Sequence, residues 1–263
     1  MSRIQRTFET LRKEGHKGLV AYVTAGDPDL ERSADVIRGL ARGGADVIEV
    51  GVPFSDPIAD GPAIQRASER ALAAGTDLGR SLDLIEGLRG EVTVPIVLFT
   101  YVNPVLRLGV ANFVDRAAAA GVDGVLLLDL PIEESEDMRE QLDQRGIDQI
   151  FLVSPTTTDA RLRVAGRLGR GFLYAISRLG VTGARDTVAA TAAPLVERVR
   201  QNAALPVALG FGISRPEHVA EVWNYADAAV VGSAIVQAVA AAVVDGVPPG
   251  ETVERFVGWL KGR

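Results

Sequence analysis

Short hydrophobic runs recur along the whole chain, and each is followed by a turn and then by an amphipathic stretch. The runs are rich in Val, Leu and Ile, which is typical of parallel strands covered by helices. There are eight such runs, at residues 18–25, 45–51, 94–101, 122–130, 148–154, 171–177, 205–212 and 226–233. The pattern therefore predicts eight buried, parallel strands.

The amphipathic stretches between the runs predict helices. The clearest cover residues 30–42, 112–120, 133–145, 189–201 and 216–223, with a further helix before the first run and another over 251–260. The start of the helix at 216–223 is marked by Ser214-Arg-Pro-Glu217, a capping box with proline at the first helical position. Ser214 is therefore expected to be the N-cap, and His218 is expected on the exposed side of this helix.

The alternation of eight strands with helices predicts an α/β protein, specifically a (β/α)8 TIM barrel with an additional N-terminal helix and a C-terminal helix. We expect a single domain over residues 1–263, because no linker-like segment divides the chain. A doubly wound open sheet is the rival architecture, but no G-x-G-x-x-G motif follows the first strand. Barrel enzymes carry their chemistry at the C-terminal ends of the strands, so the last residues of each run matter most.

Composition and charge narrow the classes of function. Hydrophobic residues make up 47% of the chain, which supports a large core, and a net charge of −6 without a basic block argues against nucleic-acid binding. The chain has no cysteine and two histidines, His16 and His218, so neither a thiolate nor a multi-histidine metal site is expected. No secretory signal or membrane-spanning run is evident, so we expect a cytoplasmic protein without membrane contact.

Glu49 interrupts the hydrophobic run ADVIEVG at residues 45–51. The alternation of a strand places its side chain on the same face as Val47 and Gly51, near the C-terminal end. If Glu49 points into the barrel mouth, desolvation raises its pKa toward about 6–7, which suits proton transfer at neutral pH. The other interpretation is a structural glutamate paired with a buried arginine or lysine. The pattern alone leaves both interpretations open.

A second carboxylate, Asp60, ends the proline-rich acidic loop at residues 53–60. Because a Gly-Pro pair follows and a helix is expected to start there, one interpretation is that Asp60 caps this helix. The other is that Glu49 and Asp60 share one pocket, where a desolvated and a polar carboxylate form a general acid–base pair. Asp56, in the same loop, is expected to be an exposed turn residue.

Glycine-rich turns follow the last three strands. They read SRLGVTGAR at 177–185, GFGIS at 210–214 and VGSAIV at 231–236. Glycine lets backbone N–H groups approach a ligand closely, and the helix that starts after Gly232 adds a favourable dipole. Barrels often bind phosphate at the loops after strands seven and eight. We therefore predict a phosphate site there, with ordinary strand–helix turns as the alternative.

Together these segments resemble one family, the α subunit of tryptophan synthase. The resemblance extends in order over nearly the whole chain, and its long second stretch is highly specific. The matching stretches are AYVTAGDPD (21–29), VIEVGVPFSDPIADGPAIQRA (47–67), LFTYVNPV (98–105), GVDGVLLLDLP (121–131), SRLGVTGAR (177–185), GFGIS (210–214) and VGSAIV (231–236). We therefore expect the fold and the activity of this family.

The resemblance implies a lyase of tryptophan biosynthesis that cleaves indole-3-glycerol phosphate to indole and glyceraldehyde 3-phosphate. This retro-aldol reaction uses no metal, and the α subunit carries no cofactor. By resemblance, Glu49 is the acid that protonates C3 of the indole ring and the base that takes the glycerol hydroxyl proton. Asp60 is the group that stabilises positive charge on the indole nitrogen.

The resemblance also assigns the substrate pocket. Two residues differ from the common family pattern: Tyr22, where phenylalanine is frequent, and Phe99, where smaller aliphatic residues are frequent. The implied indole and glycerol contacts are Tyr22, Ile64, Phe99, Tyr101, Leu126, Leu128, Tyr174 and Thr182. The implied phosphate contacts are Gly183, Phe211, Gly212, Gly232 and Ser233.

The family works as an α2β2 assembly. The β subunit holds pyridoxal phosphate and joins indole to serine, so the resemblance implies this partner and direct channelling of indole to it. Loops 53–60 and 178–190 are expected to close over the substrate, and segments 53–60 and 98–105 are the candidates for contact with the β subunit. The alternatives are a stand-alone indole-glycerol-phosphate lyase, another phosphate-binding barrel such as a sugar-phosphate isomerase, and a non-enzymatic scaffold.

Overall fold

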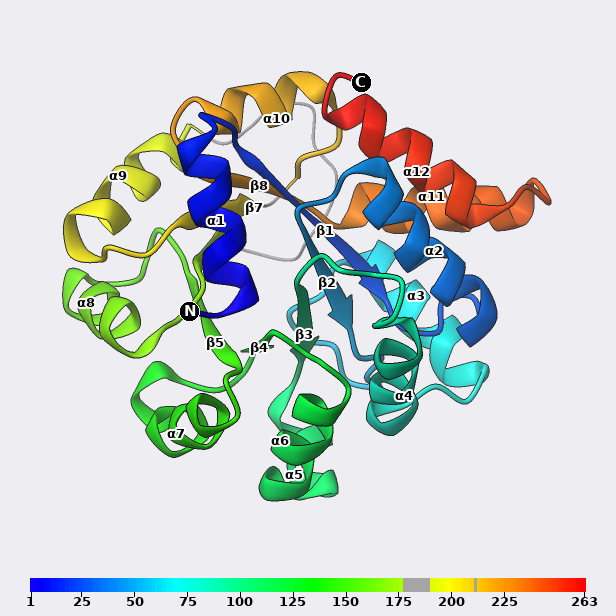
Figure 1. Ribbon diagram of the computed structural model, residues 1–263, viewed down its shortest axis with the longest axis horizontal. Coiled ribbons are helices and arrows are strands. Elements are labelled where there is room, and N and C mark those ends of the chain that lie inside the picture. The colour runs from blue at the N-terminus through cyan, green and yellow to red at the C-terminus, as the bar shows by residue number, and fades with distance from the viewer. Residues whose placement is uncertain (177–189, 211) are drawn as a thin grey trace.

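The computed structural model of the chain describes residues 1–176, 190–210 and 212–263. Its centre is a closed barrel in which the parallel strands follow one another in sequence order and β8 pairs with β1 (Figure 1). The strands are β1 Gly18–Thr24, β2 Val47–Gly51, β3 Ile96–Thr100, β4 Gly124–Leu127, β5 Asp148–Val153, β6 Leu173–Ile176, β7 Val207–Gly210 and β8 Ala228–Val231. The predicted (β/α)8 TIM barrel is therefore confirmed.

Each predicted hydrophobic run contains one strand, and each strand is shorter than its run. Some of the excess residues, such as Ala25 and Ala45, lie in turns that are themselves buried. A hydrophobic residue indicates burial, whereas a strand ends where its backbone hydrogen bonds to the neighbouring strands end. The runs therefore locate the strands and overstate their lengths.

Most helices form a ring around the barrel (Figure 1). The helices are α1 Arg3–Lys13, α2 Leu30–Gly43, α3 Pro62–Ala73, α4 Leu78–Leu88, α5 Val102–Leu108, α6 Val110–Ala119, α7 Glu136–Gln144, α8 Asp159–Leu168, α9 Ala192–Asn202, α10 Pro216–Trp223, α11 Ser233–Val244 and α12 Pro249–Leu260, with a 3-10 helix η1 at Ile132–Glu134. The helix predicted over 133–145 is divided between η1 and α7 at Ser135, whose hydroxyl donates to the carbonyl oxygen of Ile132. The additional N-terminal and C-terminal helices are present as α1 and α12.

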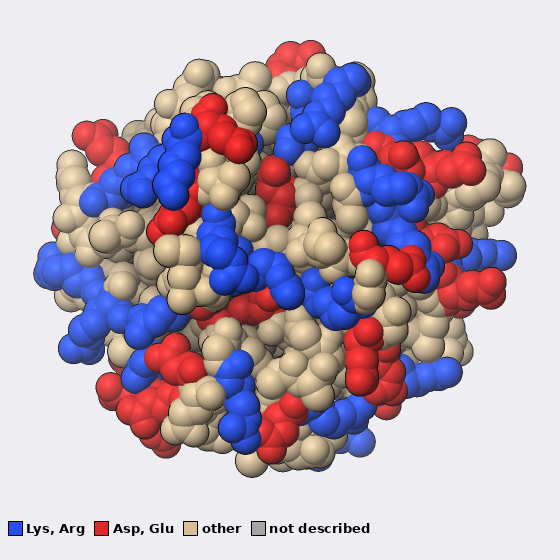
Figure 2. Space-filling view, in the orientation of Figure 1, with Lys and Arg blue, Asp and Glu red and all other residues tan. Residues whose placement is uncertain are grey.

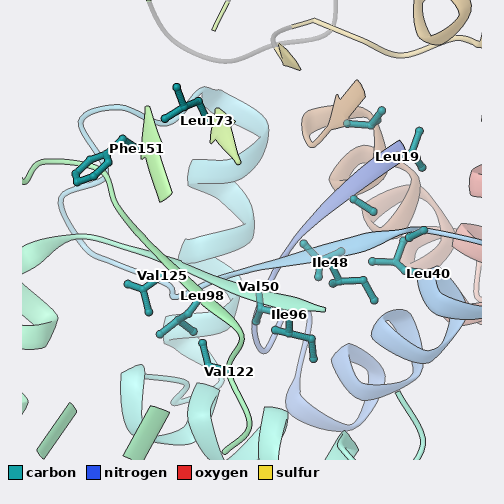
Figure 3. Packing of buried hydrophobic residues seen from close by; sticks show 14 of the residues in the cluster. Leu19, Leu40, Ile48, Val50, Ile96, Leu98, Val122, Val125, Phe151 and Leu173 are labelled. Carbon is teal, nitrogen blue, oxygen red and sulfur yellow. The ribbon is translucent and has the colours of Figure 1, made fainter. Parts of the chain in front are cut away.

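The core has two layers separated by the barrel wall. The outer layer lies between the strands and the helices, and Figure 3 shows part of it, including Ile48 and Val50. The inner layer fills the barrel with Val20, Val47, Val97, Leu126, Ile150, Ala208, Ala228 and Val230. Because Val47 lies inside and Ile48 outside, the alternation of β2 places Glu49 inside the barrel.

Helix α1 closes the N-terminal end of the barrel. Its buried residues Ile4 and Phe8 belong to the inner layer, and the ring centroid of Phe8 lies 5.5 Å from that of Phe172. A capping box starts the helix, because the Ser2 hydroxyl accepts from the backbone N–H of Gln5 and the Gln5 side chain accepts from that of Ser2. With this end filled, a ligand enters the interior from the C-terminal ends of the strands.

Two predictions about α10 are wrong. Its N-cap is Arg215, with Pro216 at the first helical position, rather than Ser214. His218 is buried rather than exposed, and its Nδ1 accepts a 3.4 Å hydrogen bond from the backbone N–H of Ser214. This short helix packs against both β8 and α12, so little of its surface is left for solvent.

The surface carries charges of both signs. On the face shown in Figure 2, Lys and Arg side chains are interspersed with Asp and Glu side chains, and neither sign forms a continuous patch there. The net charge of −6 is therefore not gathered on this face. Among the residues described, no helix has the length and apolar character needed to cross a membrane.

Candidate active site

Glu49 projects into the barrel from the middle of β2. Its register partners are Tyr22 on β1 and Val97 on β3, and Val97 belongs to the inner layer. Glu49 is 1% exposed, and its Oε1 atom has no hydrogen-bond partner among the described residues. Burial raises the pKa of this carboxyl to about 8, because an apolar interior disfavours the charged form. The interpretation of Glu49 as half of a buried ion pair finds no support in the described part of the chain.

Asp60 ends the loop between β2 and α3, and its side chain is buried. The hydroxyl of Tyr101 donates to Asp60 Oδ2 at 3.1 Å, and the side-chain amide of Gln65 donates to the Asp60 carbonyl oxygen at 2.9 Å. The same Tyr101 oxygen accepts from the backbone N–H of Ala59 at 3.1 Å, so one phenol fixes both side chain and loop. Burial raises the pKa of Asp60 to about 6, and the Tyr101 hydrogen bond opposes this rise. The N-cap of α3 is Gly61, so Asp60 does not occupy the capping position.

Two further tyrosines, Tyr22 and Tyr174, stand inside the barrel near the carboxylates. A Cβ atom at Gly51 would lie 2.1 Å from the Tyr22 hydroxyl, and one at Gly210 would lie 2.6 Å from the Tyr174 hydroxyl. Glycine at these positions therefore leaves room for each phenol ring to lean across the neighbouring strand. Burial raises the pKa of each phenol well above its ordinary value, and the charges of the two carboxylates raise it further. Both phenols are neutral at physiological pH and can donate a hydrogen bond.

An apolar wall lines the inner surface near the C-terminal ends of the strands. Tyr22 and Ile64, the latter on α3, belong to one buried cluster, and Phe99 at the end of β3 packs against it. Leu126 is fully buried in the inner layer, whereas Leu128 and Phe99 are partly exposed. The structure thus places polar acids and an apolar wall around the same end of the barrel.

The predicted phosphate turns lie at the ends of β7 and β8. Gly212 follows β7 with a φ of 85°, a conformation that favours glycine. Gly232 is the N-cap of α11 and Ser233 is its first residue, so backbone N–H groups without an intrahelical acceptor and the positive end of the helix dipole meet there. The remaining predicted site residues, Thr182, Gly183 and Phe211, lie outside the described residues.

Two contacts of Asp60 are not predicted from the sequence. The family resemblance places Tyr101 in the substrate pocket without its bond to Asp60, and it does not point to Gln65. A tyrosine directly after β3 and a glutamine in the first turn of α3 are the available signals for such contacts. Neither signal gives the direction of the side chain, because that depends on the path of the loop at 53–60.

The arrangement suits acid–base chemistry on an aromatic ring with an anionic tail. Near neutral pH, one carboxyl holds a proton in an apolar setting and the other is mainly ionised beside a hydrogen-bond donor. The start of α11, where the helix dipole and the first backbone N–H groups suit an anion, lies at the same end of the barrel. No cluster of three or more potential His, Asp or Glu metal ligands occurs among the residues that the structure describes.

A family model for the tryptophan synthase alpha chain matches residues 8–253. The chain belongs to this family. A tryptophan synthase alpha chain of Solibacter usitatus is 51% identical over 237 residues, which cover 90% of this chain and 89% of that relative. Tryptophan synthase subunit alpha of Legionella pneumophila superposes with a TM-score of 0.90 at 34% identity, over 100% of this chain and 98% of the other. A structure of Mycobacterium tuberculosis tryptophan synthase gives a TM-score of 0.90 at 37% identity, with 98% and 96% of the two chains covered.

Family membership confirms the resemblance that the sequence motifs indicate. The superpositions cover almost the entire chain, so they include the barrel, α1 and α12 together. The architecture expected from eight hydrophobic runs is therefore also the architecture of the family.

Proposed function

We propose that this chain is the α subunit of a tryptophan synthase and cleaves indole-3-glycerol phosphate to indole and glyceraldehyde 3-phosphate. This is the activity of the family to which the chain belongs. The observation that carries the proposal is Glu49, a buried carboxyl that points into the barrel and whose Oε1 has no partner among the described residues. Such a group holds a proton at neutral pH and can give it to an apolar ring.

Glu49 acts first as the general acid and then as the general base. Its proton goes to C3 of the indole ring, which becomes an electron sink with positive charge on N1. The resulting carboxylate takes the proton of the glycerol hydroxyl beside the ring, the carbon–carbon bond breaks, and its electron pair returns to the ring. The products are indole and the aldehyde of glyceraldehyde 3-phosphate, so atoms and electrons balance without a cofactor in this chain.

Asp60 is the proposed electrostatic partner of Glu49. With a pKa of about 6, it is mainly ionised at neutral pH and stabilises the positive charge that develops on the indole nitrogen. Tyr101 and Gln65 hold its side chain and backbone before the reaction starts. The two carboxyl groups therefore adopt different protonation states at one pH, as an acid and a charge stabiliser require.

The phosphate of the substrate is proposed to bind at the ends of β7 and β8, opposite the aromatic ring. The helix dipole and the first backbone N–H groups of α11, which have no acceptor within the helix, support an anion there. The proposed phosphate contacts are Gly183, Phe211, Gly212, Gly232 and Ser233. The proposed ring and glycerol contacts are Tyr22, Ile64, Phe99, Tyr101, Leu126, Leu128, Tyr174 and Thr182.

The proposed partner is a tryptophan synthase β subunit, which holds the pyridoxal phosphate of the complete α2β2 enzyme and receives indole. Several solved structures similar to this chain are of Mycobacterium tuberculosis tryptophan synthase. On this chain, Ile58 is 80% exposed and Leu106 is 60% exposed. Residues of both segments, among them Phe54 and Pro104, line one groove of about 410 Å³. We propose segments 53–60 and 98–105 as the docking surface, because exposed apolar side chains beside a groove suit a protein partner.

We further infer that residues 1–263 form a single domain, because the pairing of β1 with β8 makes the barrel one closed unit. The cytoplasmic location stays a prediction from the sequence. Passage of indole directly to the partner would keep this small, apolar product from diffusing away.

Indole release from indole-3-glycerol phosphate tests the proposal. We expect the wild-type chain to release indole, and to release it faster when a tryptophan synthase β subunit is added. Glu49→Gln keeps the size of the side chain and removes its acid, so it should lose release while still binding substrate. Glu86→Gln, the same change at an exposed position on α4, is the matched control and should retain wild-type release.

Each departure from this result points to a different alternative. High release that a β subunit leaves unchanged would favour a stand-alone lyase. No release by the wild-type chain would reject the reaction and favour another phosphate-binding barrel or a scaffold. Wild-type release by Glu49→Gln would reject the assigned acid while leaving the reaction itself in place.

A further inference from the structure

Three side chains of the inner wall point into the barrel and yet remain partly exposed. They are Phe99 at the end of β3, Leu128 just after β4, and Tyr174 on β6. One step deeper, Leu126 is fully buried. Inward side chains of a filled barrel are covered by the next layer, so partial exposure means that solvent reaches these residues from the C-terminal end. They therefore form the floor and walls of the accessible interior.

The order of strands around the barrel places the two ends of a bound substrate. The anion-binding start of α11 follows β8, and the carboxylates belong to β2 and the loop after it. In a closed barrel of eight strands, β3 and β4 lie across from β7 and β8. A substrate with its phosphate at β7–β8 and its nitrogen-containing ring between the carboxylates directs its six-membered ring toward β3 and β4. The side chains that meet this ring are Phe99 and Leu128.

Phe99 is held in place from the side of β1. Its ring packs edge to face against Tyr22, with centroids 5.3 Å apart and planes at 76°. Tyr22 is 5% exposed, and its hydroxyl lies over Gly51 and 3.4 Å from the Thr24 hydroxyl. Ile64 of α3 packs in the same cluster. Phe99 therefore cannot retreat toward β1 without displacing a packed tyrosine, and close-packed walls resist such movement.

We propose that Phe99 is a specificity-determining residue, whose ring closes the β3–β4 end of the pocket and excludes substrates with a substituent on the six-membered ring of the indole. This inference rests on the proposed function. An added methyl group needs space that a rigid aromatic wall does not provide, so the penalty falls on the substituted substrate alone. The hydroxyl of Tyr22 does not face the excluded group; the Tyr22 ring acts by supporting Phe99.

The test compares kcat/KM for unsubstituted indole-3-glycerol phosphate with kcat/KM for analogues carrying one methyl group on the six-membered ring, a separate analogue for each ring carbon. The variants are Phe99→Leu, which opens the wall, and Tyr22→Phe, which keeps the supporting ring. Phe151→Leu is the matched control, because it makes the same change on β5 with the side chain in the outer layer. Phe99→Met replaces Phe99→Leu if the latter does not fold.

We expect the wild-type chain to discriminate by about tenfold or more against at least one methyl position, the range that one methyl group reaches in an apolar pocket. Phe99→Leu should reduce this ratio about tenfold, while Tyr22→Phe and Phe151→Leu should keep the wild-type ratio. The inference is overturned if Phe99→Leu keeps the wild-type ratio, if Phe151→Leu changes it as much, or if the wild-type chain accepts every analogue equally. If the wild-type chain releases no indole from unsubstituted indole-3-glycerol phosphate, the proposed function itself is rejected.

Discussion

Three aspartates at the N-terminal end of the barrel differ sharply from the two acids of the site at its C-terminal end. Asp46, Asp123 and Asp227 each directly precede an even-numbered strand, and each accepts a hydrogen bond from a backbone N–H in the first two residues of the strand before it. The accepted groups belong to Leu19 at 2.7 Å, Ile96 at 2.8 Å and Val207 at 2.9 Å. Each aspartate also accepts from a basic side chain, namely Lys261, Arg89 and Arg200 respectively. These carboxylates are fully engaged in holding neighbouring strands together.

The two acids of the site, Glu49 and Asp60, lie toward the C-terminal end and have few partners among the described residues. Glu49 is more deeply buried than any of the three aspartates, yet its Oε1 accepts no hydrogen bond from the described residues. Within the described part of the chain, Asp60 receives one side-chain hydrogen bond, from the Tyr101 hydroxyl. A carboxylate saturated with donors stays ionised and stabilises structure, whereas a buried one without donors is costly to ionise and keeps a proton to transfer. The comparison separates these three structural aspartates from the two acids of the proposed site.

The largest expected effect is on activity, and only at the C-terminal end. Glu49→Gln should lower kcat by about 10³-fold, the usual contribution of a positioned proton donor. Asp123→Asn removes an acid at the other end and should leave kcat within about twofold at 25 °C, since surroundings away from the site do not enter the chemical step. Steady-state indole release measures both. If both variants lost the same factor in kcat, the distinction between the acids at the two ends of the barrel would be contradicted.

The next effect is on stability, at the N-terminal end. Asp123→Ala should lower the free energy of unfolding by about 3 kcal/mol, because it leaves Arg89 without its carboxylate and the Ile96 N–H without its acceptor. Urea unfolding followed by circular dichroism measures the change. An unchanged midpoint would mean that this aspartate contributes no more than an exposed one.

The third effect is a gain in the free energy of unfolding, in contrast to the loss expected for Asp123→Ala. The pKa of Glu49 is about 8 in the folded chain and near 4.5 when unfolded, so ionisation in the unfolded state lowers folded-state stability as pH rises through this window. Glu49→Gln cannot ionise and should raise the free energy of unfolding by about 4 kcal/mol at pH 8. The gain should vanish below pH 4.5, where both states of the wild-type chain are protonated. Unfolding midpoints at the two pH values test this, and a destabilised Glu49→Gln at pH 8 would contradict it.

The smallest effect concerns Tyr101. The proposed chemistry needs Asp60 ionised and Glu49 protonated, so kcat/KM should fall below pH of about 6 and above pH of about 8. Tyr101→Phe removes a hydrogen bond that favours the ionised form of Asp60, so the acid limb should move to higher pH by less than about one unit. The alkaline limb, set by Glu49, should stay in place. A shift of the alkaline limb instead would show that Tyr101 acts on Glu49.

The sequence predicts the barrel and the inward face of its second strand well. Parallel strands covered on both sides appear as continuous hydrophobic runs, so all eight strands could be located. A glutamate inside such a run stands out because charged residues are seldom buried without a reason. The family resemblance then connects Glu49 with Asp60, which spacing alone leaves open.

The contacts that complete the site could not be predicted. The bond from Tyr101 to Asp60 depends on the path of a loop of turn residues, and hydrophobic periodicity says nothing about that path. The helical pattern predicts His218 on the outer, exposed side of its helix, but α10 packs against both β8 and α12 and His218 is buried. Burial of a helix by later parts of the chain is a tertiary property, and local pattern does not reveal it.

The protonation state of Glu49 tests the central claim most directly. The side-chain carboxyl carbon of Glu49 can be followed by carbon-13 NMR during a pH titration, with Glu49→Gln used to assign its signal. A midpoint near 8 is expected for an acid that is desolvated by burial and whose Oε1 has no partner among the described residues. A midpoint at or below about 4.5, the ordinary value for glutamate, would contradict the account, because Glu49 would then carry no proton to give at neutral pH.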